Sequence, residues 1–214
     1  MYLSRVHNNG KHLLDLITDI LDLSKIESGK SGLNYERISI IELVDDLKEY
    51  IQPFVSNKGL TLHSRVDSGL NYIYADYIKI KQMLSNLLYN AVKFTEEGHI
   101  VIKVQPDDYQ SDIETDEIRL KFVVEDTGIG IPPEKKDRLF TSFSQVDGSA
   151  SRKFGGTGLG LAISKSIIDL MGGDISVESE EEKGSIFSFT AILKYYPHEQ
   201  EKKYHIPKEL QGMS

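Results

Sequence analysis

Residues 3–28 carry a hydrophobic pattern that predicts an amphipathic helix. Apolar side chains recur at the a and d positions of a heptad from Val6 to Leu23, with a break at Asn9. Further leucine and isoleucine residues widen this stripe beyond a two-stranded seam, which suits a helix packed in a bundle. Two interpretations stay open at this point: the helix packs on its own domain, or it is a dimerisation helix.

From residue 33 onward the pattern alternates between short strands and helices. Ser39 and Glu42 form a capping box that begins a helix, which runs to about Asn57 and closes at Gly59. Asp76 caps a second helix that continues through residue 93, and a third helix is expected over 158–170. Strands are expected at residues 34–37, 60–66, 71–74, 99–104, 118–125, 174–178 and 185–193.

This order of elements predicts an α+β fold, a two-layer sandwich with a mixed, mostly antiparallel sheet and helices on one face. Residues 105–117 read as a polar, acidic surface loop, and residues 126–156 as a loop-rich stretch. We expect three regions: a partial helical domain over 1–30, a main domain over 31–195, and a polar linker or tail over 196–214.

Composition narrows the functional classes. The 214-residue chain has a net charge of −8, which disfavours a nucleic-acid partner because such binding usually needs a basic patch. It has no cysteine, which excludes disulfides, thiolate zinc sites and a cysteine nucleophile. No apolar run reaches the roughly 18 residues that span a bilayer, so we expect a cytoplasmic chain without direct membrane contact. Whether a longer protein is membrane-anchored stays open.

Three glycine-rich segments stand out, at residues 126–132, 155–160 and 183–185. Glycine lets a backbone approach a ligand closely, and successive N–H groups at a helix N-terminus attract anions. Residues 156–160 are therefore a candidate triphosphate cradle. One glycine run alone is more often a turn, and none of these matches a dinucleotide fingerprint or a Gly-Lys-Ser/Thr phosphate loop. Only the three segments taken together indicate a phosphate-binding site.

A fourth element lies on the expected second helix, at residues 86–95. Asn86, Asn90 and Lys93 are spaced i, i+4 and i+7, so they share one helix face. Amide oxygens suit a hard cation, and a lysine beside them could reach a phosphate. The alternative is a polar solvent face, but the neighbouring apolar residues Leu87 and Ala91 leave that face only partly free.

Together the four elements resemble, in order and spacing, the nucleotide-binding boxes of the GHKL superfamily. This superfamily contains sensor histidine kinases, type II topoisomerases, Hsp90 and mismatch-repair ATPases. Residues 86–95 resemble the histidine-kinase form of the asparagine box, and residues 156–161 the second glycine box. Residues 139–143 resemble the phenylalanine box, which the other branches lack. The resemblance covers residues 33–194 and implies a catalytic domain that binds ATP and Mg²⁺.

For the catalytic face of the second helix, the resemblance implies that Asn90 ligates Mg²⁺, Asn86 supports the metal and phosphates, and Lys93 contacts a phosphate. Asp126 would accept a hydrogen bond from the adenine amino group and so select ATP over GTP. Residues 141–155 would form a mobile lid. The other nucleotide contacts that the resemblance implies are Gly128, Gly130, Ile131, Phe143, Gly156, Thr157, Gly158, Leu159, Gly160 and Ser185. Arg152 and Lys153 either add charge near the γ-phosphate or are solvated lid residues.

Residues 12–29 resemble the second helix of the family's dimerisation and histidine-phosphotransfer domain, which favours the dimerisation interpretation of this helix. Whether the chain forms a homodimer through it stays open, because one helix per chain is little for a stable dimer. The family's acceptor histidine is followed by an acidic residue and then, four residues later, by proline. No such box occurs here, since His7 precedes asparagine and His12 precedes leucine. We therefore expect the acceptor histidine on a helix outside this chain, which alone would bind ATP without autophosphorylating.

Three functional hypotheses follow. The first is the catalytic module of a two-component histidine kinase, with the parent kinase's acceptor helix and a response-regulator receiver domain as partners. The second is a regulatory relative that binds nucleotide without transfer. The third is another ATPase or a serine kinase of this fold. The phenylalanine box at residues 139–143 and the resemblance of residues 12–29 to a dimerisation helix disfavour it.

Overall fold

The computed structural model describes residues 32–107, 117–141 and 159–195, together with Gly10, Ile17, Leu21 and Ser24. These four single residues are helical, in agreement with the helix expected there. The rest of the expected region 1–30 and the expected tail 196–214 lie outside the described residues, so that division into domains stays a prediction.

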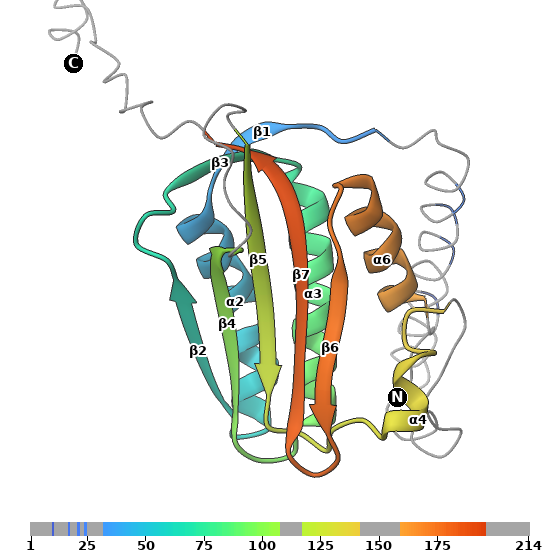
Figure 1. Ribbon diagram of the computed structural model, residues 1–214. Helices are drawn as coiled ribbons and strands as arrows, with labels where there is room; N and C mark the ends of the chain where they lie inside the picture. Colours follow the sequence, from blue (N-terminus) through green and yellow to red (C-terminus); the bar gives the residue numbers. More distant parts are fainter. Residues whose placement is uncertain are drawn as a thin grey trace, which may run out of the picture.

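One seven-stranded sheet organises the described part of the chain (Figure 1). Its strand order is β1-β3-β7-β5-β4-β2, and β6 pairs with β7 beside that path. β2 and β4 run parallel, and the other pairs are antiparallel. The strands are β1 (Glu36–Ser39), β2 (Thr61–Val66), β3 (Tyr72–Ala75), β4 (His99–Pro106), β5 (Glu117–Asp126), β6 (Ile175–Glu180) and β7 (Gly184–Lys194).

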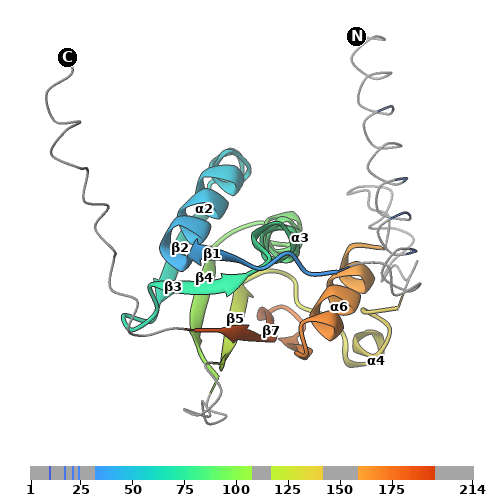
Figure 2. The same cartoon turned by 90° about the horizontal axis from the view of Figure 1, so that it is seen from above.

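The longer helices all lie on one face of this sheet, and the opposite face carries no helix among the described residues (Figure 2). They are α2 (Ile40–Asn57), α3 (Tyr77–Phe94) and α6 (Gly160–Leu170). The hydrophobic core fills the space between helices and sheet, where the Phe122 and Phe189 rings stack with centroids 4.7 Å apart. The expected α+β class, with a mixed sheet and helices on one face, is confirmed.

The helix ends follow the capping residues that the sequence predicts. Ser39 Oγ accepts the Glu42 N–H at 3.2 Å, and Asp76 Oδ1 accepts the Lys79 N–H at 3.0 Å. Helix α2 closes at Gly59, whose φ of 68° is the left-handed conformation that favours glycine. These local signals placed α2 and α3 correctly because a cap depends only on residues next to it.

Two expectations need correction. The first strand lies at Glu36–Ser39 rather than 34–37, because its register is set by antiparallel pairing with the distant β3. The stretch after Asp126 contains a short helix, α4 (Pro133–Lys136), with proline in its first turn. Four residues are too few to give a periodic signal, so the sequence pattern did not reveal it. No helix in the described ranges has the length and apolar character needed to cross a membrane.

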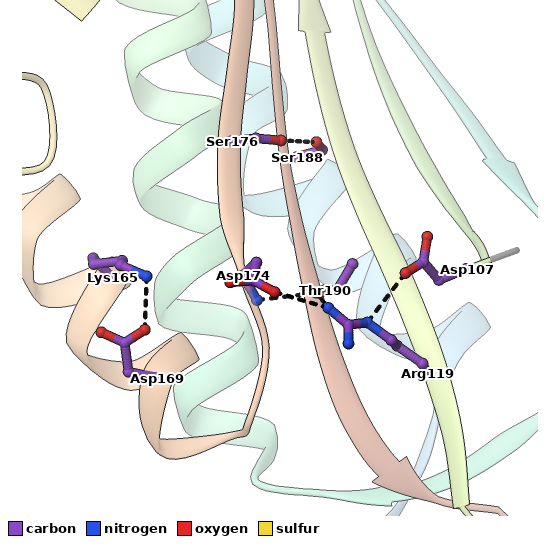
Figure 3. A network of polar contacts seen from close by, with 8 residues as sticks. All are labelled: Asp107, Arg119, Lys165, Asp169, Asp174, Ser176, Ser188 and Thr190. Carbon is purple, nitrogen blue, oxygen red and sulfur yellow. Dashed lines mark hydrogen bonds and ion pairs between the residues drawn. The ribbon is translucent and has the colours of Figure 1, made fainter. Parts of the chain in front are cut away.

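A polar network lies on the helix-free face (Figure 3). Arg119 on β5 sits between two carboxylates, with its Nε 3.1 Å from Asp107 and its Nη2 2.9 Å from Asp174. The same Nη2 donates to Thr190 Oγ1 at 3.0 Å. Since Ile118 and Leu120 on either side point into the core, the alternation of the strand places Arg119 on the opposite face.

Candidate nucleotide-binding site

The Asn86 side chain on α3 contacts the beginning of α6. Its Nδ2 donates to Ser164 Oγ at 3.2 Å, and Ser164 is almost fully buried on α6. A Cβ added at Gly160 would lie 2.4 Å from Asn86 Oδ1, so only glycine allows this close approach. The structure therefore brings Asn86 of the asparagine box against Gly160, in the described part of the second glycine box.

Asn90 and Lys93 lie on the last turns of α3. Asn90 is half-buried, and its side chain has no hydrogen-bond partner in the part of the chain that the structure describes. Burial lowers the pKa of Lys93, whose Nζ lies 4.8 Å from the centroid of the Phe94 ring. A polar amide and a partly desolvated ammonium therefore share this helix face.

Asp126 is a buried carboxylate at the end of β5. Its exposed fraction is 6%, and burial raises its pKa to about 6. The backbone N–H groups of Gly128 and Ser185 oppose that rise by hydrogen bonding, and the charge of Glu125 adds to it. The Gly128 N–H lies 2.8 Å from Asp126 Oδ1, and Ser185 on β7 is the strand partner of Asp126. A carboxylate in this position can recognise a hydrogen-bond donor of a ligand.

The glycine loop, which we define as residues 126–131, is held against the end of α3. The Ile129 N–H donates to the Phe94 carbonyl at 3.2 Å. A Cβ at Gly128 would lie 2.5 Å from the same carbonyl oxygen and 2.8 Å from Asp126 Oδ1. The loop therefore lies closer to α3 than any residue with a side chain at position 128 would allow.

The β6–β7 hairpin holds the glycine loop from the other side. The Glu182 N–H donates to the Ile129 carbonyl at 2.8 Å. Gly130 has a φ of 69°, and a Cβ there would lie 2.0 Å from the Glu180 carbonyl oxygen. The loop is thus clamped between a helix end and a hairpin, two elements far apart in the sequence.

Ser179 belongs to this clamp, although the sequence reasoning missed it. Its Oγ accepts the Ile131 N–H at 2.8 Å and lies 2.8 Å from the Gly184 carbonyl and 3.0 Å from Ser185 Oγ. Lys136 on α4 donates to the Ser179 carbonyl at 2.5 Å. The available signal was a serine at the inward-facing position that follows Ile175 and Val177 along β6.

Lys58 is a second residue that the sequence reasoning did not assign to the site. It was read as the end of its own helix, but its Nζ donates to the carbonyls of Val92, Lys93 and Thr95 at the end of α3. Nothing local in the sequence shows that pairing, because 34 or more residues separate the partners.

The structure describes most, but not all, of the expected site residues. Ile131 is partly buried against the core, and Leu159 is fully buried, so only its backbone is placed to meet a ligand. The described residues that the site brings together are Asn86, Asn90, Lys93, Asp126, Gly128, Gly130, Ile131, Leu159, Gly160 and Ser185. Phe143, Arg152, Lys153, Gly156, Thr157 and Gly158 lie outside the described residues, as does most of the expected lid.

The donor set fits Mg²⁺ bound together with a nucleotide. Within the described ranges, no three His, Cys, Asp or Glu side chains gather as a metal site would require. Mg²⁺ keeps few protein ligands and takes others from substrate phosphates, so a single amide oxygen such as that of Asn90 suits it.

Comparison with known proteins agrees with this geometry. Residues 75–195 match the model of the histidine kinase-, DNA gyrase B- and HSP90-like ATPase family. The chain is 45% identical over 190 residues to hybrid signal transduction histidine kinase B of Dictyostelium discoideum, covering 88% of this chain and 9% of that protein. It is 40% identical over 209 residues to sensor protein GacS of Pseudomonas syringae, covering 96% of this chain and 22% of that protein.

Solved structures give the same result. Full-length ShkA, solved in complex with AMPPNP, superposes with a TM-score of 0.79 at 32% identity, covering 92% of this chain and 39% of that chain. Histidine kinase ThkA, solved with the response regulator TrrA, gives a TM-score of 0.63 at 25% identity, covering 93% of this chain and 52% of that chain.

The chain therefore belongs to the histidine kinase-, DNA gyrase B- and HSP90-like ATPase family. Within it, the chain carries the catalytic domain of two-component histidine kinases, and its relatives include hybrid sensor kinases. It spans about a tenth to a quarter of the length of the curated relatives that it matches.

Proposed function

We propose that this chain binds Mg–ATP and presents its γ-phosphoryl group to a histidine on a helix outside the chain. The observation that carries the proposal is the meeting of α3, α6 and the glycine loop. Asn86 contacts the first turn of α6, and the end of α3 contacts the loop that contains the buried Asp126.

Each group has a distinct role in this proposal. Asp126 accepts a hydrogen bond from the adenine amino group, while the glycine loop lies against the base. Asn90 holds Mg²⁺, which supplies charge neutralisation at the phosphates, and the ammonium of Lys93 contacts a phosphate oxygen. Phosphoryl transfer depends mainly on alignment and on neutralising charge, so these groups need only hold the nucleotide in place.

The partners in this proposal lie in the longer protein or outside it. We infer an acceptor histidine on a preceding helix, a receiver domain of a response regulator, and a homodimer through the N-terminal helix. The exposed Ile17 and Leu21, spaced i and i+4, support an apolar helix face that another helix could cover. Because the chain contains no acceptor box, we expect it to bind ATP in the cytoplasm without autophosphorylating on its own.

A calorimetric titration tests the nucleotide site directly. We would titrate ATP and ADP, with and without Mg²⁺, into the chain and into Asn90→Ala. Asn57→Ala, at the exposed end of α2, is the matched control. We expect Mg²⁺ to strengthen binding to the chain and to the control, and to have little effect on Asn90→Ala. Failure of the unmodified chain to bind either nucleotide would contradict the proposal.

A second assay separates transfer from regulation. The chain would be mixed with labelled ATP and with a separate helical domain that carries an acceptor histidine in the acidic box described above. Label on that histidine, and none on the chain alone, is the expected result. Tight ATP binding without any transfer would instead favour a regulatory relative of the kinases.

A further inference from the structure

The C-terminal end of α3 has an unusually complete set of partners for its last carbonyl groups. A helix end normally leaves four carbonyls without intrahelical donors. Here the Ala91 carbonyl accepts the Thr95 N–H, and the Phe94 carbonyl accepts the Ile129 N–H of the glycine loop. The remaining two, those of Val92 and Lys93, accept from Lys58 Nζ at 2.7 and 2.9 Å.

Lys58 also reaches one residue beyond the helix, where its Nζ donates to the Thr95 carbonyl at 2.9 Å. An ammonium has three donors, and three carbonyls here surround one ammonium. Its positive charge also complements the partial negative charge at the end of the α3 dipole. The contact is therefore stronger than a neutral cap of the same helix would be.

The backbone that carries Lys58 is itself well fixed. The Lys58 N–H donates to the Val55 carbonyl at 3.2 Å. The next residues, Gly59 and Leu60, donate to the Ser56 and Val55 carbonyls at 3.1 Å, which closes α2 in a Schellman arrangement. A side chain on such a helix end can hold its partners at a defined distance.

We propose that Lys58 is a positioning residue for the nucleotide site. Asn90 and Lys93 lie on the turn whose carbonyls Lys58 holds, and Phe94, in the same turn, holds the glycine loop through its carbonyl. By fixing this turn, Lys58 sets the spacing between the phosphate side of the site and its adenine side. This inference rests on the proposed nucleotide site and adds a residue to it that acts only through α3.

Amide exchange in the unliganded chain gives the first test, since it does not depend on nucleotide. Lys58→Met keeps the aliphatic stem and removes the donors. We expect the Ile129 and Gly128 amides of this variant to exchange at least tenfold faster, while core amides of α2 stay unchanged. Lys58→Arg, which keeps the charge and the donors, should restore most of the protection.

ADP affinity gives the second test, measured well below the melting temperature so that only folded protein is compared. We expect Lys58→Met to bind ADP about tenfold more weakly, with partial recovery in Lys58→Arg. The control is Lys48→Met, which removes an exposed α2 lysine that pairs with Asp45 at 3.3 Å and should leave both readouts unchanged.

The outcomes separate this inference from the proposed function. Wild-type exchange at Ile129 in a folded Lys58→Met variant would overturn the positioning role, whatever the affinity. If the unmodified chain fails to bind ADP, the proposed function is wrong, and the exchange data still decide the role of Lys58. Should Lys58→Met not fold, Lys58→Gln takes its place, and wild-type exchange in that variant would overturn the inference equally.

Discussion

At the scale of single residues, opposing influences act on the pKa of the Asp126 carboxyl. It is buried, yet two backbone N–H groups bond to its carboxylate, and its pKa rises to about 6. Because the ionised form is the better acceptor for an amino group, we expect ADP affinity to fall as the pH drops through 6. The loss approaches tenfold per pH unit below that value. Calorimetry between pH 5 and 8 measures it.

The Asp126→Asn variant is the matched control for this titration. Asparagine cannot ionise, so its ADP affinity should be weaker at pH 8 and nearly flat with pH. The stability of the unmodified chain should change in the opposite direction. The pKa of Asp126 is about 6 in the folded state and 3.8 in the unfolded state. The free energy of unfolding therefore falls as the pH rises from about 4 through about 6. Asp126→Asn should lack that fall in urea unfolding. An unchanged pH profile of ADP binding in the variant would contradict the assignment.

Two glycines with nearly the same φ allow a second test at this scale. Gly59 and Gly130 have φ values of 68° and 69°, but a Cβ at Gly59 meets nothing within 4 Å. At Gly130 it would lie 2.0 Å from the Glu180 carbonyl oxygen, a backbone atom that cannot rotate away. We expect Gly59→Ala to cost about 1 kcal/mol of unfolding free energy from φ strain alone. Gly130→Ala should cost at least about 3 kcal/mol, because the hairpin must also move.

Urea unfolding of both variants gives these costs, and ADP titration gives a second readout. Gly59→Ala should bind ADP as the unmodified chain does, while Gly130→Ala should bind at least tenfold more weakly because the glycine loop is displaced. Equal costs and equal affinities for the two variants would show that the loop and the hairpin do not depend on their close approach.

At the scale of elements, the sequence predicted the helix ends that depend on adjacent residues. It did not predict the strand position that depends on pairing with a distant segment. Ser39, Asp76 and Gly59 fixed three helix ends correctly, since caps and left-handed closures depend on adjacent residues. The strand β1 was misplaced, because its register comes from β3.

The same distinction applies to the site. Asn86, Asn90 and Lys93 could be predicted from helical spacing within one segment. The bond of Ser179 to Ile131 and the bonds of Lys58 to the end of α3 join segments that are 34 to 48 residues apart, and no spacing rule gives such pairs. A motif therefore shows which residues meet the ligand, while the residues that hold those motifs in place need the fold.

The β6–β7 hairpin supplies the prediction at this scale. Ser179→Ala removes the acceptor of the Ile131 N–H and the partner of the buried Ser185 hydroxyl. Loss of these bonds should weaken ADP binding several-fold and lower stability by about 1 to 2 kcal/mol. Ser176→Ala is the control, since Ser176 lies on the same strand but contacts Ser188 on the helix-free face (Figure 3). Similar ADP affinities for the two variants would contradict the role of the clamp.

At the scale of the whole molecule, the two faces of the sheet carry different groups of residues. The helices and the core lie on one face of the sheet (Figure 2), and the candidate site lies at the end of β5 that carries Asp126. The helix-free face carries the Arg119 network, which links Asp107, Asp174 and Thr190 across neighbouring strands. Arg119 is seven residues from Asp126 along β5, which corresponds to roughly 23 Å. The network is therefore too far from the site to contact a nucleotide there.

Arg119→Met tests whether the nucleotide site is independent of this distant network. The change leaves Asp107 and Asp174 without the cation that they share, so stability should fall. The cost should be at least about 1 kcal/mol: the pair with Asp174 is screened because that carboxylate is 78% exposed, but the pair with Asp107 is mostly buried. ADP affinity should stay within twofold of the unmodified chain, since Arg119 takes no part in the contacts that α3, the glycine loop and Ser179 of the hairpin make with one another. Arg65→Met, an exposed change on β2, controls for lost surface charge. A tenfold loss of affinity in a folded Arg119→Met variant would mean that the whole sheet, rather than the local clamp, sets the geometry of the site.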